Sequence, residues 1–402
     1  MKKINFLGDS ITEGAGASTC ENRYTTLTAK YLNVEECNYG VGGTRIAKQK
    51  TYKYPNIDDN EFMRRAVVMA DDADFTFVFG GTNDYGHGDA QLGCMEDRDT
   101  YTFYGAMHEL VAYLLDKFGK ERDIETDALI LSVGHSARDT IEMLYKKGIN
   151  MMQKPFSVGA RIEHPQEYIN SVQYGEFKNH PKLKAADYKL ACHPPHGRGA
   201  YTFCMCPGGT VVCASSQKGG VVTNGMSEFA RDKENANSAI LVGVEPADFP
   251  TEHPLSGFEL QRSIEEKAFS LGGGDYSAPA TLVGDFLRCQ KSTKLGFVKP
   301  SFTTGVTMGD ISEALPQKVV NTMRDALVQM DKKLKGFAMD EAVLTAPETR
   351  SSSPVRIIRD EFFQTNVRGL YPCGEGAGYA GGIVSAGVDG VKCAEAVLSD
   401  LT

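Results

Sequence analysis

The stretch GLYPCGEGAGYAGGIVSAGVDG, residues 369–390, decides the fold of the C-terminal part of the chain. A short apolar segment leads into a glycine-rich loop, and a helix rich in small residues, 385–401, is predicted to follow. A strand, a glycine-rich turn and a helix N-terminus together form an anion site, because unpaired N–H groups and the helix dipole point at the ligand. A tight loop also uses glycine for positive φ alone, so a structural turn is the alternative. The loop glycines are Gly374, Gly376, Gly378, Gly381 and Gly382.

The composition is typical of a soluble globular protein, with 402 residues, 41% apolar and 24% charged. This length predicts about two or three domains. A net charge of −9 without a basic patch argues against nucleic acid or an anionic membrane surface as a partner. We expect no membrane span, because the sequence has no run of about 18 apolar residues. Ten irregularly spaced cysteines and a very short apolar N-terminal run favour a cytoplasmic protein. We expect its partner to be a small-molecule substrate.

Polar loops directly follow three predicted strands in the N-terminal third of the chain. The apolar strand at 3–7 runs into GDSITEG, a second strand ends in NYGVGGTRI at 38–46, and a third at 75–79 precedes GGTNDYGHG. Because the carboxyl ends of parallel strands meet at one edge of a sheet, these loops are expected to gather there. Ser10, at the end of the first strand, is a candidate nucleophile. Its alternative role is a helix N-cap.

These loops carry a resemblance to a known family over about residues 1–120. GDSIT with Ser10, the glycine pair ending at Gly43, and GTND with Asn83 resemble the first three sequence blocks of the SGNH (GDSL-type) esterases and lipases. The resemblance implies that Ser10 is the nucleophile. It also implies an oxyanion hole formed by the N–H groups of Ser10 and Gly43 and the side-chain amide of Asn83.

The base of that family has no clear counterpart in this chain. The family places a catalytic Asp three residues before the catalytic His near the end of the domain, because the serine needs a base and the base needs an orienting group. Here the D-x-x-H pattern occurs at Asp84–His87, inside the third block itself. We expect His87 to be a loop residue at the rim of the cleft, since a base must also reach Ser10.

The character of the chain changes at 121–125, where charged residues precede an apolar strand at 128–133 that ends at Gly134. A capped helix follows this strand. From residue 154, short β-rich runs broken by glycine and proline predict a mostly antiparallel sheet, and residues 256–340 are expected to be largely helical. No serine-, glycine- or proline-rich linker separates the two parts, which suggests a fusion of incomplete units.

Five ordered blocks between residues 126 and 402 resemble the C-terminal part of bacterial FAD-dependent, NAD(FAD)-utilising dehydrogenases. The blocks are TDALILSVGHSARD, KPFSVGARIEHPQ, CMCPGG with VVTNGMS and NANSA, ETRSSSPVRI, and GLYPCGEGAGYAGGI. The resemblance implies an α/β protein: a parallel three-layer, flavodoxin- or Rossmann-like sheet portion with an inserted, mostly antiparallel α+β substrate-type domain. The expected domains are 1–122 as an incomplete SGNH/GDSL hydrolase-like segment, 123–153 with 355–402 as FAD/Rossmann-like elements, and 154–354 as the substrate-type domain.

The same resemblance implies half of a flavin site, with NAD(P)H as electron donor. Gly134 would end a strand near the FAD pyrophosphate, and Glu375, between Gly374 and Gly376, would hydrogen-bond the ribityl chain. The backbone of Gly381, Gly382 and Ile383 would face the flavin N1/O2 edge. The G-x-G-x-x-G motif that should begin such a domain is missing before residue 126, so FAD lacks its pyrophosphate loop.

Three further groups have both a chemical and a structural interpretation. Cys204 and Cys206 form a C-x-C pair that is either redox-active or simply packed in the core. His193 and His196 lack a third ligand nearby, which favours a turn over a metal site. Arg350 either presents a cation to an anionic ligand or precedes a capping turn at Ser351–Ser353.

The sequence therefore predicts an FAD-dependent oxidoreductase fused to a truncated SGNH segment. A Ser10 esterase is the first alternative. A catalytically incomplete fusion is the second.

Overall fold

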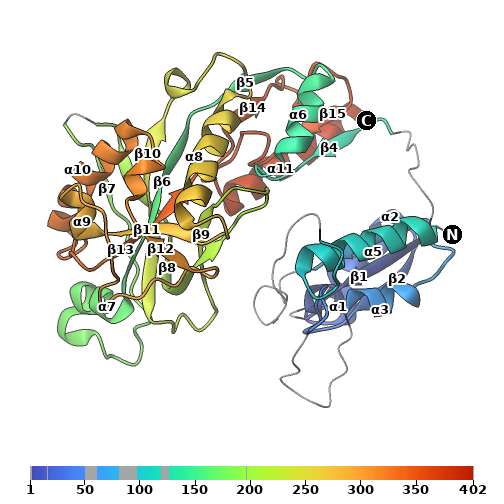
Figure 1. Cartoon of the computed structure of the whole chain (residues 1–402). Helices are drawn as coiled ribbons and strands as arrows, with labels where there is room; N and C mark the ends of the chain where they lie inside the picture. Colours follow the sequence, from blue (N-terminus) through green and yellow to red (C-terminus); the bar gives the residue numbers. More distant parts are fainter. Residues whose placement is uncertain are drawn as a thin grey trace. The chain divides into compact units, whose positions relative to one another are not determined.

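The computed structural model describes residues 2–15, 17–49, 61–80, 97–118, 126–195 and 197–401 (Figure 1). The chain divides into two compact units, Met1–Ile124 and Glu125–Thr402. In the described residues no helix combines the length and apolar character needed to cross a membrane.

The first unit is built on a three-stranded parallel sheet of order β2-β1-β3. Lys3 is in register with Glu35 of β2, and Ile4 with Phe75 of β3. The strands predicted from the sequence at 3–7 and 75–79 are confirmed as β1 and β3. Both are apolar runs bounded by turn residues, which is the usual sequence pattern of a strand. The elements are β1 (Lys3–Gly8), α1 (Ser10–Glu13), η1 (Cys20–Asn22), α2 (Tyr24–Leu32), β2 (Glu35–Gly40), α3 (Phe62–Val67), β3 (Phe75–Phe79) and α5 (Phe103–Phe118).

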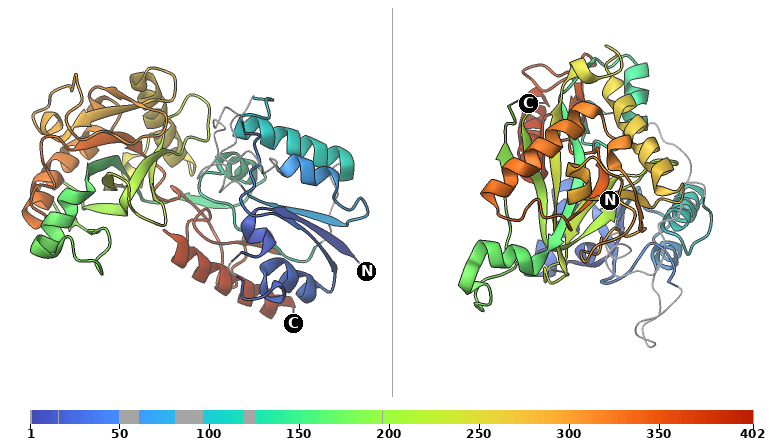
Figure 2. Two further views of the ribbon diagram at one scale, coloured as in Figure 1. Left: turned by 90° about the horizontal axis from the view of Figure 1, so that it is seen from below. Right: turned by 60° about the vertical axis from the view of Figure 1, so that its left-hand side comes forward.

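Helices lie on both faces of this small sheet (Figure 2). On one face, Leu7 packs into a core with Phe62 of α3 and Leu110 of α5. On the other face, Phe6 contacts Tyr24 of α2, with ring centroids 6.1 Å apart. Because successive side chains of a strand point to opposite faces, β1 contributes to both layers.

Two strand-end glycines let α1 lie directly against the sheet. A Cβ added at Gly8 would lie 1.9 Å from Thr12 Oγ1, and one added at Gly40 would lie 2.1 Å from the Glu13 nitrogen. A real Cβ cannot come that close to these atoms. These glycines therefore fix the turn that carries Ser10 at the end of β1.

The second unit is organised around an eight-stranded sheet of order β12-β11-β13-β6-β10-β8-β7, with β9 paired to β8. All its pairs are antiparallel except β11 with β12. This confirms the mostly antiparallel sheet expected from the β-rich runs after residue 154. The strands are β6 (Phe156–Pro165), β7 (Ala191–Cys192), β8 (Ala200–Cys213), β9 (Thr223–Ser227), β10 (Asn235–Val244), β11 (Ala278–Leu282), β12 (Val306–Met308) and β13 (Val343–Glu348).

The main core lies between this sheet and α10 (Gln317–Lys333). Val319, Met323 and Leu327 recur at helical spacing and are buried against strand residues such as Ile162 and Ile240. The other helices of the unit are α6 (Arg138–Lys146), α7 (Gln166–Tyr174), α8 (Ser256–Gly272) and α9 (Val283–Leu287), with short turns η2 (Gly175–Phe177), η3 (Pro246–Asp248) and η4 (Ile311–Glu313).

Residues 256–340 are less helical than the sequence predicts. Between α8 and α10 the chain enters the sheet twice, as β11 and β12. Both strands are short, and β11 pairs with β13, which lies more than 60 residues later in the chain. Its sequence, APATL, is too brief to show a two-residue period, and tertiary pairing decides its conformation.

Two small sheets and a long helix complete the unit. Strand β4 (Leu129–Leu131) pairs in parallel with β15 (Leu370–Pro372), and β5 (Met151–Gln153) pairs antiparallel with β14 (Val355–Ile357). Helix α11 (Ile383–Leu401) follows the glycine-rich loop after β15. The protein is thus an α/β chain with a small parallel sheet in one unit and a large, mostly antiparallel sheet in the other.

Candidate functional site

The Ser10 turn presents a hydroxyl at the end of β1. Asp9, not Ser10, is the N-cap of α1, because its carboxylate accepts the Ile11 N–H at 3.0 Å. The capping alternative for Ser10 is therefore wrong. Among the described residues the Ser10 side chain has no hydrogen-bond partner, and the residue is half-buried. The side chain is thus uncommitted.

The glycine pair predicted for the oxyanion hole lies beside this serine. The Glu13 carboxylate accepts the Gly42 N–H at 2.7 Å. A Cβ built on Gly42 would lie 3.6 Å from Ser10 Cβ, so the two residues are close neighbours. Gly43 adopts φ +75° with open space on its Cβ side. Asn83 and Asp84–His87 lie outside the described residues.

Two backbone donors remain uncommitted at this point. Within the described ranges, neither the Ser10 N–H nor the Gly43 N–H has a hydrogen-bond acceptor. The Gly42 N–H, by contrast, is held by Glu13. An oxyanion hole needs donors that point at the position of the developing charge and that no other group occupies. Ser10 lies in the turn after β1, and Gly43 follows Gly42 in the loop after β2; the oxyanion hole itself stays a prediction.

Arg65 of α3 ties the strand ends of the first unit together. Its guanidinium donates to the carbonyl oxygens of Gly8 and Tyr39, each at 2.5 Å, and to Thr44 Oγ1 at 2.7 Å. Burial lowers its pKa to about 10. The sequence analysis missed this residue. The one available signal is an arginine on the apolar face of a helix, at a position where its neighbours Phe62 and Ala66 are buried.

In the second unit, the glycine-rich loop is fixed by an ion pair from α11. Asp389 accepts the Gly374 N–H at 2.8 Å and binds the Arg359 guanidinium, with Nη2 2.6 Å from Oδ1. Arg359 in turn lies over the Tyr379 ring, 3.6 Å from its centroid. Gly374 has φ +78°, which the hydrogen bond to Asp389 holds in place. Sequence reasoning did not identify Asp389, because it lies within the helix.

The predicted loop glycines divide into two groups. A Cβ on Gly376 would lie 1.8 Å from the Val133 carbonyl oxygen, so this glycine lets the loop contact the end of β4 next to Gly134. Gly381 and Gly382 have no atom within 4 Å of a built Cβ. Gly376 therefore has a structural role, because it lets the loop approach Val133 closely. Gly381 and Gly382 lie at the start of α11, where no described atom is near.

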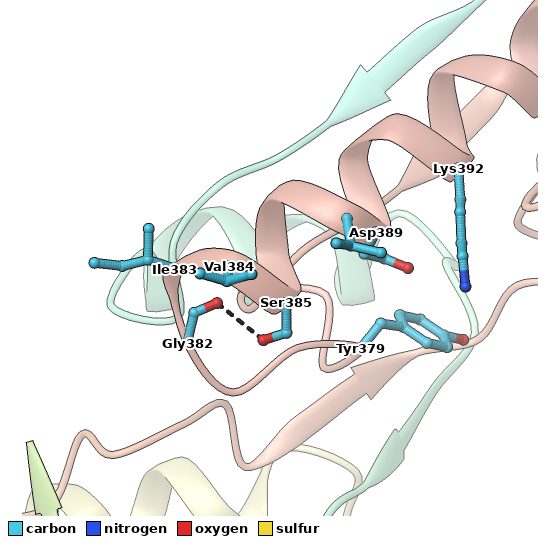
Figure 3. Close-up of a pocket in the computed structure, with 8 residues that line it drawn as sticks. Tyr379, Gly382, Ile383, Val384, Ser385, Asp389 and Lys392 are labelled. Carbon is cyan, nitrogen blue, oxygen red and sulfur yellow. Dashed lines mark hydrogen bonds between the residues drawn. The ribbon is translucent and has the colours of Figure 1, made fainter.

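An open groove lies along the first turns of α11 (Figure 3). Its volume is about 740 Å³, and Ser385 Oγ donates to the Gly382 carbonyl at 3.0 Å within it. Ile383 is 92% exposed at the helix N-terminus. The first N–H groups of a helix have no intrahelical acceptor, so this end can bind an anion. The groove is lined by Tyr379, Gly382, Ile383, Val384, Ser385, Val388, Asp389 and Lys392.

Glu375, a half-buried residue of the loop, lies beside His135. Burial raises the pKa of its carboxyl group, and the charge of Lys154 opposes that shift. His135 Nε2 lies 3.5 Å from Glu375 Oε1. Burial lowers the pKa of His135 to about 4, and the charges of Arg350, Arg138 and Lys154 add to this. Because the imidazole is neutral at pH 7, this contact is not an ion pair there.

Arg350 is committed to the protein interior. It donates to Glu265 at 3.0 and 3.2 Å and to Ser216 Oγ at 2.5 Å. Ser351 and Ser353 donate to nearby backbone carbonyls, at 2.7 and 2.8 Å. These contacts support the structural alternative for this segment.

The predicted histidine pair is only half described, since His196 lies outside the described ranges. In the described part of the chain no three metal-ligating side chains are grouped.

Two family models match the chain. Residues 6–147 match the GDSL-like lipase/acylhydrolase family, and residues 155–351 match the family described as FAD-dependent protein, C-terminal domain-like. The chain thus joins a GDSL-type hydrolase segment to an FAD-dependent-protein C-terminal-like domain, as the sequence blocks predict. No FAD-binding domain is identified by these matches.

An uncharacterized protein of Clostridium beijerinckii is 53% identical over 279 residues, which cover 69% of this chain and 52% of that protein. The chain therefore spans about half the length of this curated relative. A solved crystal structure is 27% identical and covers 34% of this chain and 61% of its own, with a TM-score of 0.26. A carbohydrate acetylesterase family member from Sinorhizobium meliloti is 20% identical and covers 32% and 61%, with a TM-score of 0.22.

Proposed function

We propose that the first unit carries a serine hydrolase site that acts on a small ester, with Ser10 as its nucleophile. The observation that carries the proposal is the Ser10 hydroxyl, which has no hydrogen-bond partner among the described residues and lies next to Gly42, the residue before Gly43. The match of residues 6–147 to the GDSL-like lipase/acylhydrolase family supports it.

The chemistry assigns a role to each group. Ser10 Oγ attacks the ester carbonyl carbon and gives its proton to a base. The carbonyl oxygen becomes an oxyanion, which accepts hydrogen bonds from the Ser10 and Gly43 N–H groups and, by resemblance, from the Asn83 amide. The tetrahedral intermediate collapses to an acyl-serine as the alcohol leaves with the proton, and water then releases the acid.

The base is a histidine of the chain, acting without the family's D-x-x-H arrangement. The first unit holds two histidines, His87 and His108, and His108 lies on α5. Replacing each by glutamine separates them, because only loss of the base removes the acidic limb of the pH–rate profile. Retention of that limb in both variants would place the base elsewhere in the chain.

Hydrolysis of p-nitrophenyl acetate by the full chain tests the proposal. Ser10→Ala should lower the enzyme-dependent rate by about 10³-fold or more, because the covalent step is lost. Ser18→Ala is the matched control, since Ser18 is in the same unit and its hydroxyl only accepts from Asn22. A rate in Ser10→Ala equal to that of the wild type would exclude Ser10 as nucleophile.

A second candidate function concerns the start of α11, where we infer a site for the isoalloxazine end of a flavin, with NAD(P)H as electron donor. No described atom lies near a Cβ built on Gly381 or Gly382, the first N–H groups of α11 have no intrahelical acceptor, and Glu375 in the preceding loop adds a half-buried carboxyl group. These features fit the ring end of FAD. The family match of residues 155–351 supports the proposal.

The G-x-G-x-x-G motif expected to hold the pyrophosphate end of FAD is missing before residue 126. The dinucleotide should therefore gain little over the mononucleotide, and no catalytic step is derived through FAD.

Flavin fluorescence titration distinguishes these ends of the cofactor. We expect FMN and FAD to bind with dissociation constants within about tenfold of each other. Gly381→Glu fills the open space with a negatively charged side chain and should abolish binding of both flavins. Gly387→Ala is the control, because Gly387 of α11 also has no atom near a built Cβ. If neither flavin binds, or Gly381→Glu binds like the wild type, the site is not a flavin site.

A further inference from the structure

Cys204 and Cys206 lie on an irregularity of β8 that neither proposed function uses. Phe203 is in register with Ala239 of β10, whereas Cys206 is in register with Asn237. Three steps along β8 therefore face two steps along β10, which is a β-bulge. Cys204 has φ +45°, a left-handed conformation that is uncommon for a residue with a side chain.

The bulge brings the Cys206 thiol to the backbone of Cys204. In a regular strand, residues i and i+2 are about 7 Å apart, whereas a disulfide needs Cβ atoms about 4 Å apart. Here Cys206 Sγ lies 3.2 Å from the Cys204 carbonyl oxygen, to which the thiol donates its hydrogen bond. The buried Cys206 thiol is thus held against the Cys204 backbone before any oxidation occurs.

A buried arginine faces the same pair. Arg161 Nη1 donates to the Cys204 carbonyl at 2.7 Å and lies 4.0 Å from Cys206 Sγ. Its opposite edge binds Glu348, with Nη2 3.0 Å from Oε1. This pairing keeps the guanidinium in a fully buried position beside the thiols.

The surroundings distinguish the two thiols. Cys204 is exposed and Cys206 is buried. The neighbouring Cys206 thiol lowers the pKa of the Cys204 thiol, and the charge of Arg161 adds to this effect. Interaction with Cys204 and burial raise the pKa of Cys206. An accessible thiolate next to a buried protonated thiol is the arrangement of an attacking and a resolving cysteine.

We propose that Cys204 and Cys206 form a redox-active dithiol that reduces small-molecule disulfides. The Cys204 thiolate attacks one sulfur of the disulfide RSSR, forms a mixed disulfide and expels one thiolate, which takes up a proton as RSH. Cys206 Sγ then attacks Cys204 Sγ, loses its proton and expels the second RSH. The protein dithiol is oxidised by two electrons to the Cys204–Cys206 disulfide, and RSSR is reduced to two RSH.

Dithiodipyridine, a disulfide whose released pyridinethione absorbs light, tests the proposal on the reduced full chain. We expect a fast phase that releases two pyridinethiones and leaves the 204–206 peptide lighter by about 2 Da, without an adduct. Cys206→Ser should release one pyridinethione in that phase and retain a pyridylthio adduct on Cys204. Cys204→Ser should lose the fast phase.

Cys289 supplies the matched control, because it is also exposed and also has positive φ, +57°. Its thiol should react at least roughly tenfold more slowly than Cys204, and Cys289→Ser should keep the fast phase. Cys206→Ala is a second test of the same position, in case Cys206→Ser does not fold. Its circular dichroism spectrum is compared with that of the wild type to check its folding. A stable adduct on Cys204 in the wild-type protein, or a Cys289 that reacts as fast, would overturn the proposal.

Discussion

The Arg138 guanidinium and the Glu265 carboxylate form a bidentate ion pair in the interior of the second unit. The two nitrogen–oxygen distances are 2.7 and 3.0 Å, and the side chains are 1% and 2% exposed. Arg350 donates to the same carboxylate from the other side. One carboxylate therefore balances two buried guanidinium groups, which explains why Arg350 is not available to an external anion.

Glu265→Gln should lower the free energy of unfolding of the second unit by about 3–5 kcal/mol, because two buried cations lose their counter-ion. Urea denaturation followed by circular dichroism measures the loss, and hydrogen exchange in α8 assigns it to this unit. Arg288→Ala removes an exposed pair with Asp340 and should cost less than about 1 kcal/mol. Equal effects of the two substitutions would contradict the expected importance of the buried charge.

Substitution of Gly40 tests whether the strand-end glycines set the geometry of the Ser10 turn. Gly40→Ala should destabilise the first unit and abolish Ser10-dependent hydrolysis, because its Cβ would lie 2.1 Å from the Glu13 backbone nitrogen. Gly43→Ala meets no atom of the described residues and should cost only about 1–3 kcal/mol, from its positive φ. Thermal unfolding and ester hydrolysis are measured on both variants. A Gly40→Ala protein as stable and as active as the wild type would show that α1 can shift without consequence.

Burial of neutral His164 should make the free energy of unfolding fall as the pH is lowered. Burial lowers its pKa to about 4, and its Nε2 lies 2.8 Å from the Phe337 carbonyl oxygen. The unfolded chain binds the proton more readily, so this stability is fully present above pH about 6.5 and is lost as the pH falls toward 4. The loss amounts to about 3 kcal/mol.

His164→Gln isolates this contribution, since Gln keeps a donor for Phe337 and does not titrate. Denaturation curves at pH 7 and pH 4.5 should differ less for the variant than for the wild type. The comparison between proteins is needed because buried Glu163 and Glu348 have raised pKa values and contribute with the opposite sign. Identical pH dependence in the two proteins would mean that His164 is not buried in its neutral form.

The sequence predicted the elements whose signals are local. The apolar runs at 3–7 and 75–79 and the helical spacing of Val319, Met323 and Leu327 suffice to locate β1, β3 and α10. β11 was missed because its partner strand is distant in sequence. Two buried arginines were missed for the same physical reason: Arg65 meets strand ends from two other elements, and Arg138 meets a carboxylate 127 positions away. Such contacts leave no periodic signal.

Asp389 provides the last prediction, because it links the glycine-rich loop to α11. Burial opposes ionisation of its carboxyl group, but hydrogen bonds from Arg359 and the Gly374 N–H outweigh burial and lower its pKa. Asp389→Asn removes the charge-assisted bonds and should cost about 2–3 kcal/mol at pH 7. The same substitution weakens the hydrogen bond to the Gly374 N–H and should weaken FMN binding at the start of α11.

Asp400→Asn is the control for this substitution, since Asp400 is also on α11 but accepts only peripheral hydrogen bonds, from Tyr371 and Gln364. It should leave FMN affinity unchanged. The stability difference between wild type and Asp389→Asn should disappear as the pH falls through the lowered pKa of Asp389, because the wild-type carboxylate is then protonated. A constant difference down to pH 2 would show that Asp389 acts through its shape and not through its charge.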